Sequence, residues 1–202
     1  MLQIIYLHGF LSGPDSAKAR LVEDWLSNNR PNIQFLCPNL SAYPDKSIET
    51  LEYLIAENLE FTPMLLGSSL GGYWATWLSE TCDLPVLLVN PAVRPSILLP
   101  EYLGVELKNY YSEEVCTLSE SDIEILTSVE KSEISCKENY WLMAQTEDET
   151  LDYKLAVKKY AGCRQLVENG GNHGFADFGR WIPSAIDFLV RRREEILAER
   201  PC

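Results

Sequence analysis

Short apolar runs alternate with segments of helical periodicity along most of the chain, and this alternation restricts the fold more than any other feature of the sequence. The apolar runs have the length and the β-branched or aromatic content typical of strands, and they are residues 2–8, 33–38, 63–68, 85–91, 139–146 and 163–168. They are continuously apolar, which indicates strands with both faces buried. The segments with helical spacing between and after them are residues 16–29, 47–59, 70–80, 151–160 and 179–199.

This order of elements predicts an α/β protein in which helices cover both faces of a six-stranded, mainly parallel sheet. Parallel neighbours require crossover connections, which are right-handed in nearly all proteins. The chain has 202 residues, which is enough for one domain with a sizeable core and short for two. We therefore expect residues 1–202 to form a single three-layer domain.

Residues 92–138 interrupt the alternation. They contain the apolar stretch "SILLPEYLG" and the acidic stretch "SEEVCTLSESDIEILTSVEKSE", whose second half is compatible with one or two short helices. A loop of this length without secondary structure is uncommon inside a compact domain. We expect a small helical insertion that forms a cap over one edge of the sheet. A surface insertion without function is the alternative.

The third apolar run ends in Gly67-Ser68-Ser69-Leu70-Gly71, directly before a helical segment. Gly-x-Ser-x-Gly between a strand and a helix is typical of a nucleophile elbow, a tight turn that presents the central serine at the N-terminus of the helix. Gly67 and Gly71 suit this turn because a Cβ atom at either position would clash. The pattern indicates Ser69 as the nucleophile. A glycine-rich turn with a serine N-cap is the alternative.

A serine nucleophile needs a base, and histidine suits neutral pH. The chain has two histidines. His173 follows the last apolar run, in a loop expected at the carboxyl ends of the strands, and it is the candidate base. His8 ends the first run and is expected to brace the next loop through hydrogen bonds. In that loop the Phe10 N–H, together with the Leu70 N–H, is the candidate donor pair of an oxyanion hole.

The acid that orients the imidazole lies between the nucleophile and the histidine in the chain order of this fold. Glu147, Asp148, Glu149 and Asp152 follow the fifth apolar run. Asp148 is the preferred candidate because it lies between that run and the next helical segment, whereas Asp152 is expected inside the helix. A charged helix N-terminus, favoured by the helix dipole, is the alternative for all four acids.

We expect an acyl pocket between the elbow and residues 92–138. Apolar residues near the candidate catalytic groups are its candidate lining, although core packing is the more common role of such residues. They are Leu11, Tyr73, Trp74 and Phe175, with Leu98, Leu99 and Tyr102 from the insertion. Asn90, at the end of the fourth run, is expected to cap the turn of that strand or to form a hydrogen bond into the site.

The net charge of −13 disfavours several kinds of partner. Nucleic acid requires lysine and arginine to neutralise its phosphates, and an anionic membrane surface attracts basic rather than acidic chains. No run approaches 18 apolar residues, and the first residues lack the basic and apolar regions of a signal peptide. We expect a cytoplasmic protein that acts on a small molecule, without a nucleic-acid or membrane partner.

The cysteines are scattered, at positions Cys37, Cys82, Cys116, Cys136, Cys163 and Cys202. None forms a C-x-x-C pair or combines with a histidine at zinc spacing, so we expect reduced thiols, no metal and no organic cofactor. The glycine-rich segment also lacks the G-x-G-x-x-G and P-loop patterns, which argues against a nucleotide-binding protein.

Several motifs resemble, in order, the small YqiA/YcfP-type esterases of the α/β-hydrolase superfamily. They are "YLHGFLSGPDSAKA", "GSSLGGYWATWL", "NPAVRP", "QTEDETLDY" and "GGNHGF". The resemblance extends from residue 4 to about residue 190. It implies a single-domain serine hydrolase with strand order 2-1-3-4-5-6 and a triad of Ser69, Asp148 and His173. The relatives usually have glycine where this chain has Glu147, a carboxylate that we expect to raise the pKa of Asp148 or to compete for His173.

These residues predict acyl transfer to water through an acyl-enzyme on Ser69, without a cofactor. A serine esterase acting on acyl esters is the preferred function. An acyl thioesterase is a close alternative, because the same triad serves both bonds. A peptidase shares the triad and is less favoured. A non-catalytic binding protein of this fold is also less favoured, because such proteins usually lack a triad residue.

Overall fold

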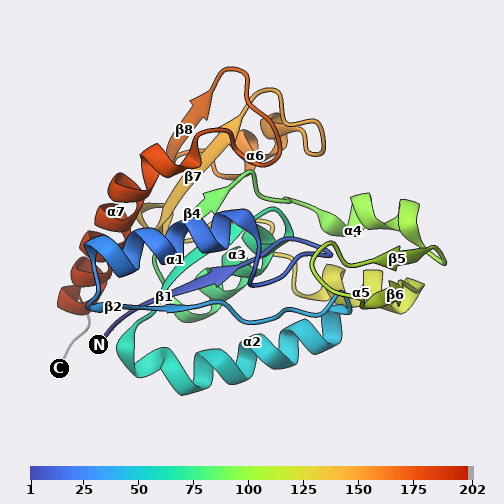
Figure 1. The fold of residues 1–202 in the computed structure, drawn as a ribbon, viewed down its shortest axis with the longest axis horizontal. Helices are drawn as coiled ribbons and strands as arrows, with labels where there is room; N and C mark the ends of the chain where they lie inside the picture. Colours follow the sequence, from blue (N-terminus) through green and yellow to red (C-terminus); the bar gives the residue numbers. More distant parts are fainter. Residues whose placement is uncertain (200–202) are drawn as a thin grey trace.

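A computed structural model of the chain describes residues 1–199. Its centre is a six-stranded sheet of order β2-β1-β3-β4-β7-β8, in which all neighbouring strands are parallel (Figure 1). The strands are β1 (Leu2–Leu7), β2 (Ile33–Leu36), β3 (Met64–Ser68), β4 (Val86–Val89), β7 (Tyr140–Gln145) and β8 (Arg164–Glu168). If only the six strands of this sheet are numbered along the chain, their order is 2-1-3-4-5-6, as the family resemblance implied.

The strand labels depart from that numbering because the insertion contains two more strands, β5 (Glu106–Lys108) and β6 (Val115–Thr117), which the sequence did not predict. They pair antiparallel in a separate two-stranded sheet. Each has only three residues, which is too short to show a periodicity.

Helices cover both faces of the main sheet. On one face, the core contains buried residues of α1 (Ala17–Asn29) and α7 (Ile182–Glu199). On the other face, it contains buried residues of α2 (Pro44–Asn58), α3 (Leu70–Cys82) and α6 (Tyr153–Lys159). Every residue of β3, β4 and β7 is buried, which explains why these strands are continuously apolar or nearly so.

Residues 92–138 form a mixed insertion rather than a purely helical one. It contains α4 (Pro95–Leu98), the 3-10 helix η2 (Leu99–Tyr102), the β5–β6 hairpin and α5 (Glu120–Ser128). Figure 1 shows these elements gathered at one end of the molecule, on the side to which the arrow of β1 points. Two hydrogen bonds tie the hairpin to the loop after β1, from Tyr110 N–H to the Leu11 carbonyl (2.8 Å) and from the Asn109 amide to the Ser12 carbonyl (2.9 Å).

Two smaller predictions can be compared with the described residues. The last helix begins at Ile182 and is preceded by a 3-10 turn over Phe178–Trp181, so the predicted start at residue 179 falls in that turn. Free thiols are present at Cys37, Cys116, Cys136 and Cys163, while Cys202 lies outside the described residues.

Within residues 1–199, no helix combines the length and the apolar content needed to cross a membrane. No group of three or more metal-ligating side chains lies together there either.

Candidate active site

The turn after β3 holds Ser69 in an unusual backbone conformation. Its φ is 56° and its ψ is −124°, a combination that residues with a side chain seldom adopt. The Ser69 N–H donates to the Val89 carbonyl (3.1 Å), and the Ser69 carbonyl accepts from the N–H groups of Gly72 and Ala92 (2.9 Å each). The turn is therefore fixed to β4 and to the segment that follows β4.

The glycines of the turn lie where three backbone segments meet. A Cβ atom at Gly67 would lie 2.4 Å from the Gly71 carbonyl oxygen, and one at Gly71 would lie 1.9 Å from the Leu7 carbonyl oxygen. Gly72 has the same restriction, because its Cβ atom would lie 2.5 Å from the Cβ atom of Pro91. Contacts this short are not possible, so glycine is required at Gly67 and Gly71 by the close approach of β1, β3 and α3, and at Gly72 by the segment after β4.

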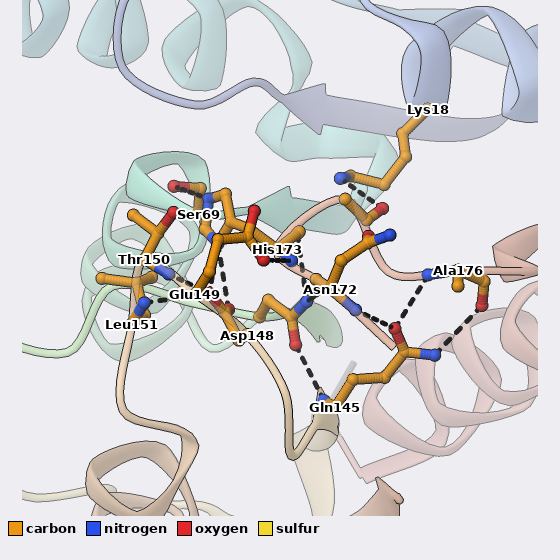
Figure 2. A network of polar contacts seen from close by, with 12 residues as sticks. Lys18, Ser69, Gln145, Asp148, Glu149, Thr150, Leu151, Asn172, His173 and Ala176 are labelled. Carbon is orange, nitrogen blue, oxygen red and sulfur yellow. Dashed lines mark hydrogen bonds and ion pairs between the residues drawn. The ribbon is translucent and has the colours of Figure 1, made fainter. Parts of the chain in front are cut away.

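The structure brings the three predicted triad residues together, as Figure 2 shows. His173 Nε2 lies 3.0 Å from Ser69 Oγ, and His173 Nδ1 lies 3.0 Å and 2.9 Å from the two carboxylate oxygens of Asp148. An Nδ1–H that donates to the carboxylate leaves Nε2 free of its proton and able to accept the serine hydroxyl. The three side chains come from the loops after β3, β7 and β8.

Asp148 is the buried member of this group, with a side chain that is 2% exposed. Burial by itself raises the pKa of Asp148. Hydrogen bonds from His173 and from the N–H groups of Leu151 and Thr150 outweigh burial and hold this pKa below its ordinary value of 3.8. Asp148 is consequently a carboxylate at neutral pH.

The neighbouring acids have other contacts. Glu149 accepts the backbone N–H of His173 at 2.9 Å, and this bond lowers the pKa of Glu149. Asp152 is the N-cap of α6. The prediction that Asp152 lies inside this helix is therefore wrong. Glu147 is exposed, the pKa of Asp148 is lowered rather than raised, and His173 Nδ1 faces the carboxylate of Asp148. The predicted disturbance by Glu147 is therefore not seen.

Gln145 supports the loop that carries His173. This side chain is 3% exposed and ends β7. Its oxygen accepts from the N–H groups of Asn172 (3.1 Å) and Ala176 (2.8 Å). Its amide nitrogen donates to the Ala176 carbonyl at 3.0 Å (Figure 2) and to Glu168, also at 3.0 Å. One buried amide thus binds the loop on both sides of the histidine.

Asn90 supports the same loop from β4. Its side-chain nitrogen donates to the carbonyls of Asn172 and His173 at 3.0 Å each, and its oxygen accepts the Gln145 N–H at 3.0 Å. Asn90 therefore bonds into the site rather than only capping its own turn. The sequence did not single out Gln145. The available signal was a polar residue at the end of an otherwise apolar strand, which is costly to bury unless it is fully hydrogen-bonded.

Lys18 contacts the loop from α1. Its Nζ donates to the Gly174 carbonyl at 2.8 Å (Figure 2). Burial lowers the pKa of Lys18 to about 8, while the charge of Asp148 acts in the opposite direction. The histidine loop is therefore held from α1, from β4 and from β7.

His8 braces the loop after β1, as predicted. It is 2% exposed, its Nδ1 lies 2.9 Å from the Gly9 carbonyl, and its Nε2 accepts the Leu40 N–H at 2.9 Å. A ring that donates through Nδ1 and accepts through Nε2 is neutral. Burial favours that form and lowers the pKa of His8 below 6.5. The brace positions the loop that continues into Phe10.

A cavity of about 350 Å³, called the catalytic cavity below, opens beside Ser69 and His173. Phe10 and Leu70, the candidate oxyanion donors, line it. The predicted lining residues Leu11, Leu98, Leu99 and Tyr102 also line it. The lining residues that the sequence did not identify are Ala92, Pro95, Glu101, Leu107, Tyr110, Thr150 and Leu151. Most of them belong to the insertion, whose fold could not be predicted.

Three residues predicted to line the pocket lie in the core instead, so that prediction is wrong. Tyr73 and Trp74 are each 2% exposed, and the Tyr73 hydroxyl donates to the Leu126 carbonyl. Phe175 is also 2% exposed and packs against Phe178 in the core on the opposite face of the sheet. Nearness in sequence to a candidate catalytic residue does not set the direction of a side chain. Tyr73 and Trp74 lie on α3, which is buried along most of its circumference, so their side chains pack in the core.

Comparison with known proteins links this architecture to a family. A family model described as "Uncharacterised protein family (UPF0227)" matches residues 3–190. Among curated proteins, the UPF0227 protein YcfP of Escherichia coli is 26% identical over 102 residues, a segment that covers 46% of this chain and 52% of that protein. The match thus spans about half the length of the curated relatives.

Solved structures show the fold. A putative hydrolase from Agrobacterium vitis S4 has a TM-score of 0.70 and 17% identity, with 93% of this chain and 88% of that one covered. Mouse alpha/beta hydrolase domain-containing protein 10 has a TM-score of 0.68 and 18% identity, with coverages of 94% and 90%. The chain has the α/β-hydrolase fold, and the match over residues 3–190 shows that it belongs to the UPF0227 family.

Proposed function

We propose that the protein is a serine hydrolase that cleaves carboxylic acyl esters. The observation that carries this proposal is the continuous set of hydrogen bonds from Asp148 through His173 to Ser69, beside a cavity with largely apolar walls. Proteins with a similar fold are named as hydrolases, which supports the same class of reaction.

The geometry suits acyl transfer by general-base catalysis. His173 Nε2 takes the hydroxyl proton as Ser69 Oγ attacks the acyl carbonyl carbon. Asp148 keeps the other ring nitrogen protonated and stabilises the imidazolium that forms. The imidazolium then protonates the leaving oxygen, and water releases the acid from Ser69 by the same route.

The developing oxyanion needs hydrogen-bond donors. We assign this role to the backbone N–H groups of Phe10 and Leu70, because both residues line the cavity together with Ser69. Removal of one such donor typically costs roughly 100- to 1,000-fold in rate. A thioester is cleaved by the same steps, with sulfur in place of the leaving oxygen, and is the alternative substrate.

The test is hydrolysis of p-nitrophenyl esters, from acetate to dodecanoate, by the wild type and by Ser69→Ala and His173→Ala. We expect each variant to lose activity by about 10,000-fold or more. Ser68→Ala is the matched control, because Ser68 occupies the same turn but lies at the end of β3. Circular dichroism establishes that each variant is folded. Equal turnover by the wild type and by Ser69→Ala, or none by folded wild type on any ester, would overturn the proposal.

A further inference from the structure

A second cavity, of about 610 Å³, adjoins the catalytic cavity. The two share a wall formed by residues 92–95, because Ala92 and Pro95 line the catalytic cavity whereas Val93 and Arg94 line the second one. Helix α6 and the loop before it form another common wall, with Leu151 on the catalytic side and Leu155 on the other. The two cavities are therefore lined by neighbouring residues of the same two segments of the chain.

The second cavity gathers positive charge in a chain that is strongly acidic. The basic residues that line it are Arg94, Lys131, Lys137, Lys158 and Lys159, and the acidic ones are Glu130 and Glu133. In the whole sequence, by contrast, 30 acidic residues outnumber 17 lysines and arginines. The local balance of charge is thus the reverse of the global one, and we call this space the basic cavity.

The four lysines of the basic cavity form no ion pair with a described residue, although the charges of Glu130 and Glu80 act on Lys159. Arg94 pairs with Glu130, with 3.6 Å between Nε and Oε1. Among residues 1–199, none of the ion pairs involves Lys131, Lys137 or Lys158, and Lys159 has none either. Because five basic and two acidic residues line this cavity, its lining carries a net positive charge that attracts an anion.

Lys159 connects the basic cavity to the shared wall. Its Nζ donates to the Val93 carbonyl at 3.4 Å. Lys159 is half-buried, and burial lowers the pKa of its ammonium group. A charge in such a position interacts more strongly with an opposite charge than a fully hydrated one does.

We propose that the basic cavity binds a phosphate group carried by the alcohol or thiol part of the acyl substrate, while the acyl chain occupies the catalytic cavity. This proposal rests on the proposed function and specifies its substrate class. The apolar walls provided by Leu98, Leu99 and Leu107 suit the acyl chain, which leaves the anionic part for the basic side. Lysine ammonium groups bind phosphate as point charges without a fixed orientation.

The chemistry of the step is unchanged. The Ser69 Oγ forms a bond to the acyl carbon, and the bond from that carbon to the leaving oxygen or sulfur breaks. His173 Nε2 passes the serine proton to the leaving atom, so that a phosphorylated alcohol or thiol departs with its phosphate intact. Water then attacks the acyl carbon, gives one proton to His173 and releases the carboxylic acid, after which Ser69 regains its proton.

The test uses two pairs of substrates that differ in the phosphorylated part. Octanoyl-coenzyme A is compared with octanoyl-N-acetylcysteamine, and octanoyl glycerol phosphate with monooctanoyl glycerol. We expect kcat/KM to be higher by about tenfold or more for the phosphorylated member, mainly through a lower KM. The pair with the larger ratio shows whether the phosphate comes from a thiol or from an alcohol.

Variants locate the effect. In Lys131→Gln/Lys158→Gln the ratio of the two kcat/KM values should fall toward one. Lys154→Gln is the matched control, because Lys154 also lies on α6 but does not line the basic cavity, and it should keep the wild-type ratio. If the neutral substrates are cleaved as fast as the phosphorylated ones, or if the control loses the ratio equally, the phosphate site is refuted while the proposed function stands.

If no substrate is cleaved, the proposed function fails, and the basic cavity is tested by binding alone. Isothermal titration of coenzyme A into the Ser69→Ala protein should then show binding. A protein that also carries Lys131→Gln and Lys158→Gln should lose this binding, whereas one that also carries Lys154→Gln should keep it. Absence of binding, or binding that the lysine variants do not weaken, overturns the phosphate site.

Discussion

Ser69 combines an unfavourable backbone conformation with a hydrogen bond to the candidate base. A residue held at a positive φ of this kind costs on the order of 1–3 kcal/mol, and it persists only where its surroundings enforce it. The bonds of its N–H and carbonyl groups to β4 and to the following segment provide that enforcement. The strain is explained by the need to expose the hydroxyl at the N-terminus of α3.

At the same scale, the contacts of the acids predict unequal effects. Asp148→Asn should lower kcat/KM by about 10,000-fold, because the amide can no longer both accept from Nδ1–H and stabilise an imidazolium. Glu149→Gln should lower it far less, since Glu149 contacts only the backbone N–H of His173. Ester hydrolysis measures both. A larger loss for Glu149→Gln or Glu147→Gln would move the acid assignment away from Asp148.

Gln145 is predicted to act as a positioning residue. Gln145→Glu keeps the shape but replaces the donor that faces Glu168 and the Ala176 carbonyl with an acceptor. Displacement of His173 should lower kcat by about 100-fold with little change in KM. Relative to the wild type at the same pH, the activity should partly recover at lower pH, where the introduced carboxyl is protonated and donates again.

The control for this prediction is Gln165→Glu. Gln165 makes a comparable set of bonds, to the carbonyls of Val157 and Tyr160, but lies on β8 outside the catalytic loop. Relative to the wild type at the same pH, it should show no recovery of kcat on acidification. The same pH profile in both variants, or an unchanged kcat in Gln145→Glu, would show that Gln145 has no positioning role.

At the scale of elements, the site depends on how closely α3 approaches β1 and β3. The triad itself bridges the loops after three strands, so the spacing between these strands determines whether the serine and the histidine meet. The insertion completes the catalytic cavity through α4, η2 and the β5–β6 hairpin. Its hydrogen bonds to Leu11 and Ser12 attach it to the loop of the candidate oxyanion donor.

Gly71→Ala should disrupt this junction. The added Cβ atom would lie 1.9 Å from the Leu7 carbonyl oxygen, and only a shift of the backbone can relieve that contact. We expect a loss of about 3 kcal/mol or more in the free energy of unfolding, together with loss of activity. Gly13→Ala is the control, because its Cβ atom would meet Tyr111 at an ordinary 3.7 Å. Urea denaturation measures both, and equal stability of the two variants would contradict the prediction.

At the scale of the whole molecule, His8 should make stability depend on pH. Burial lowers the pKa of His8 below 6.5, so between the folded and unfolded pKa values the unfolded chain binds more protons. The free energy of unfolding therefore decreases as pH falls through that window, by up to about 1.4 kcal/mol per pH unit. The pKa of Asp148 is held below 3.8, so protonation of Asp148 lowers the free energy of unfolding further only at lower pH.

Urea denaturation between about pH 7 and about pH 5 measures this dependence. His8→Gln should be less stable than the wild type at neutral pH, because the bond from the Leu40 N–H is disturbed. Its stability should then change less with pH than that of the wild type. An identical slope in the two proteins would assign the pH dependence to other groups.

The sequence by itself was sufficient for the kind and order of the main elements and for the three side chains that meet at the site. Continuous apolar runs indicate buried parallel strands, and Gly-x-Ser-x-Gly at a strand end reflects a local backbone requirement at Gly67 and Gly71. The strand order came from the resemblance to a family and not from periodicity. The catalytic roles of Ser69, Asp148 and His173 remain predictions.

Only the tertiary structure decided what surrounds the site. Tyr73, Trp74 and Phe175 turn into the two cores, while Gln145 reaches the histidine loop through bonds to residues at least 23 positions away. The hairpin of the insertion and the basic cavity likewise depend on contacts between distant segments. Local propensity and motif spacing report interactions between neighbours in the chain, whereas side-chain direction and cavity walls depend on which distant segments pack together.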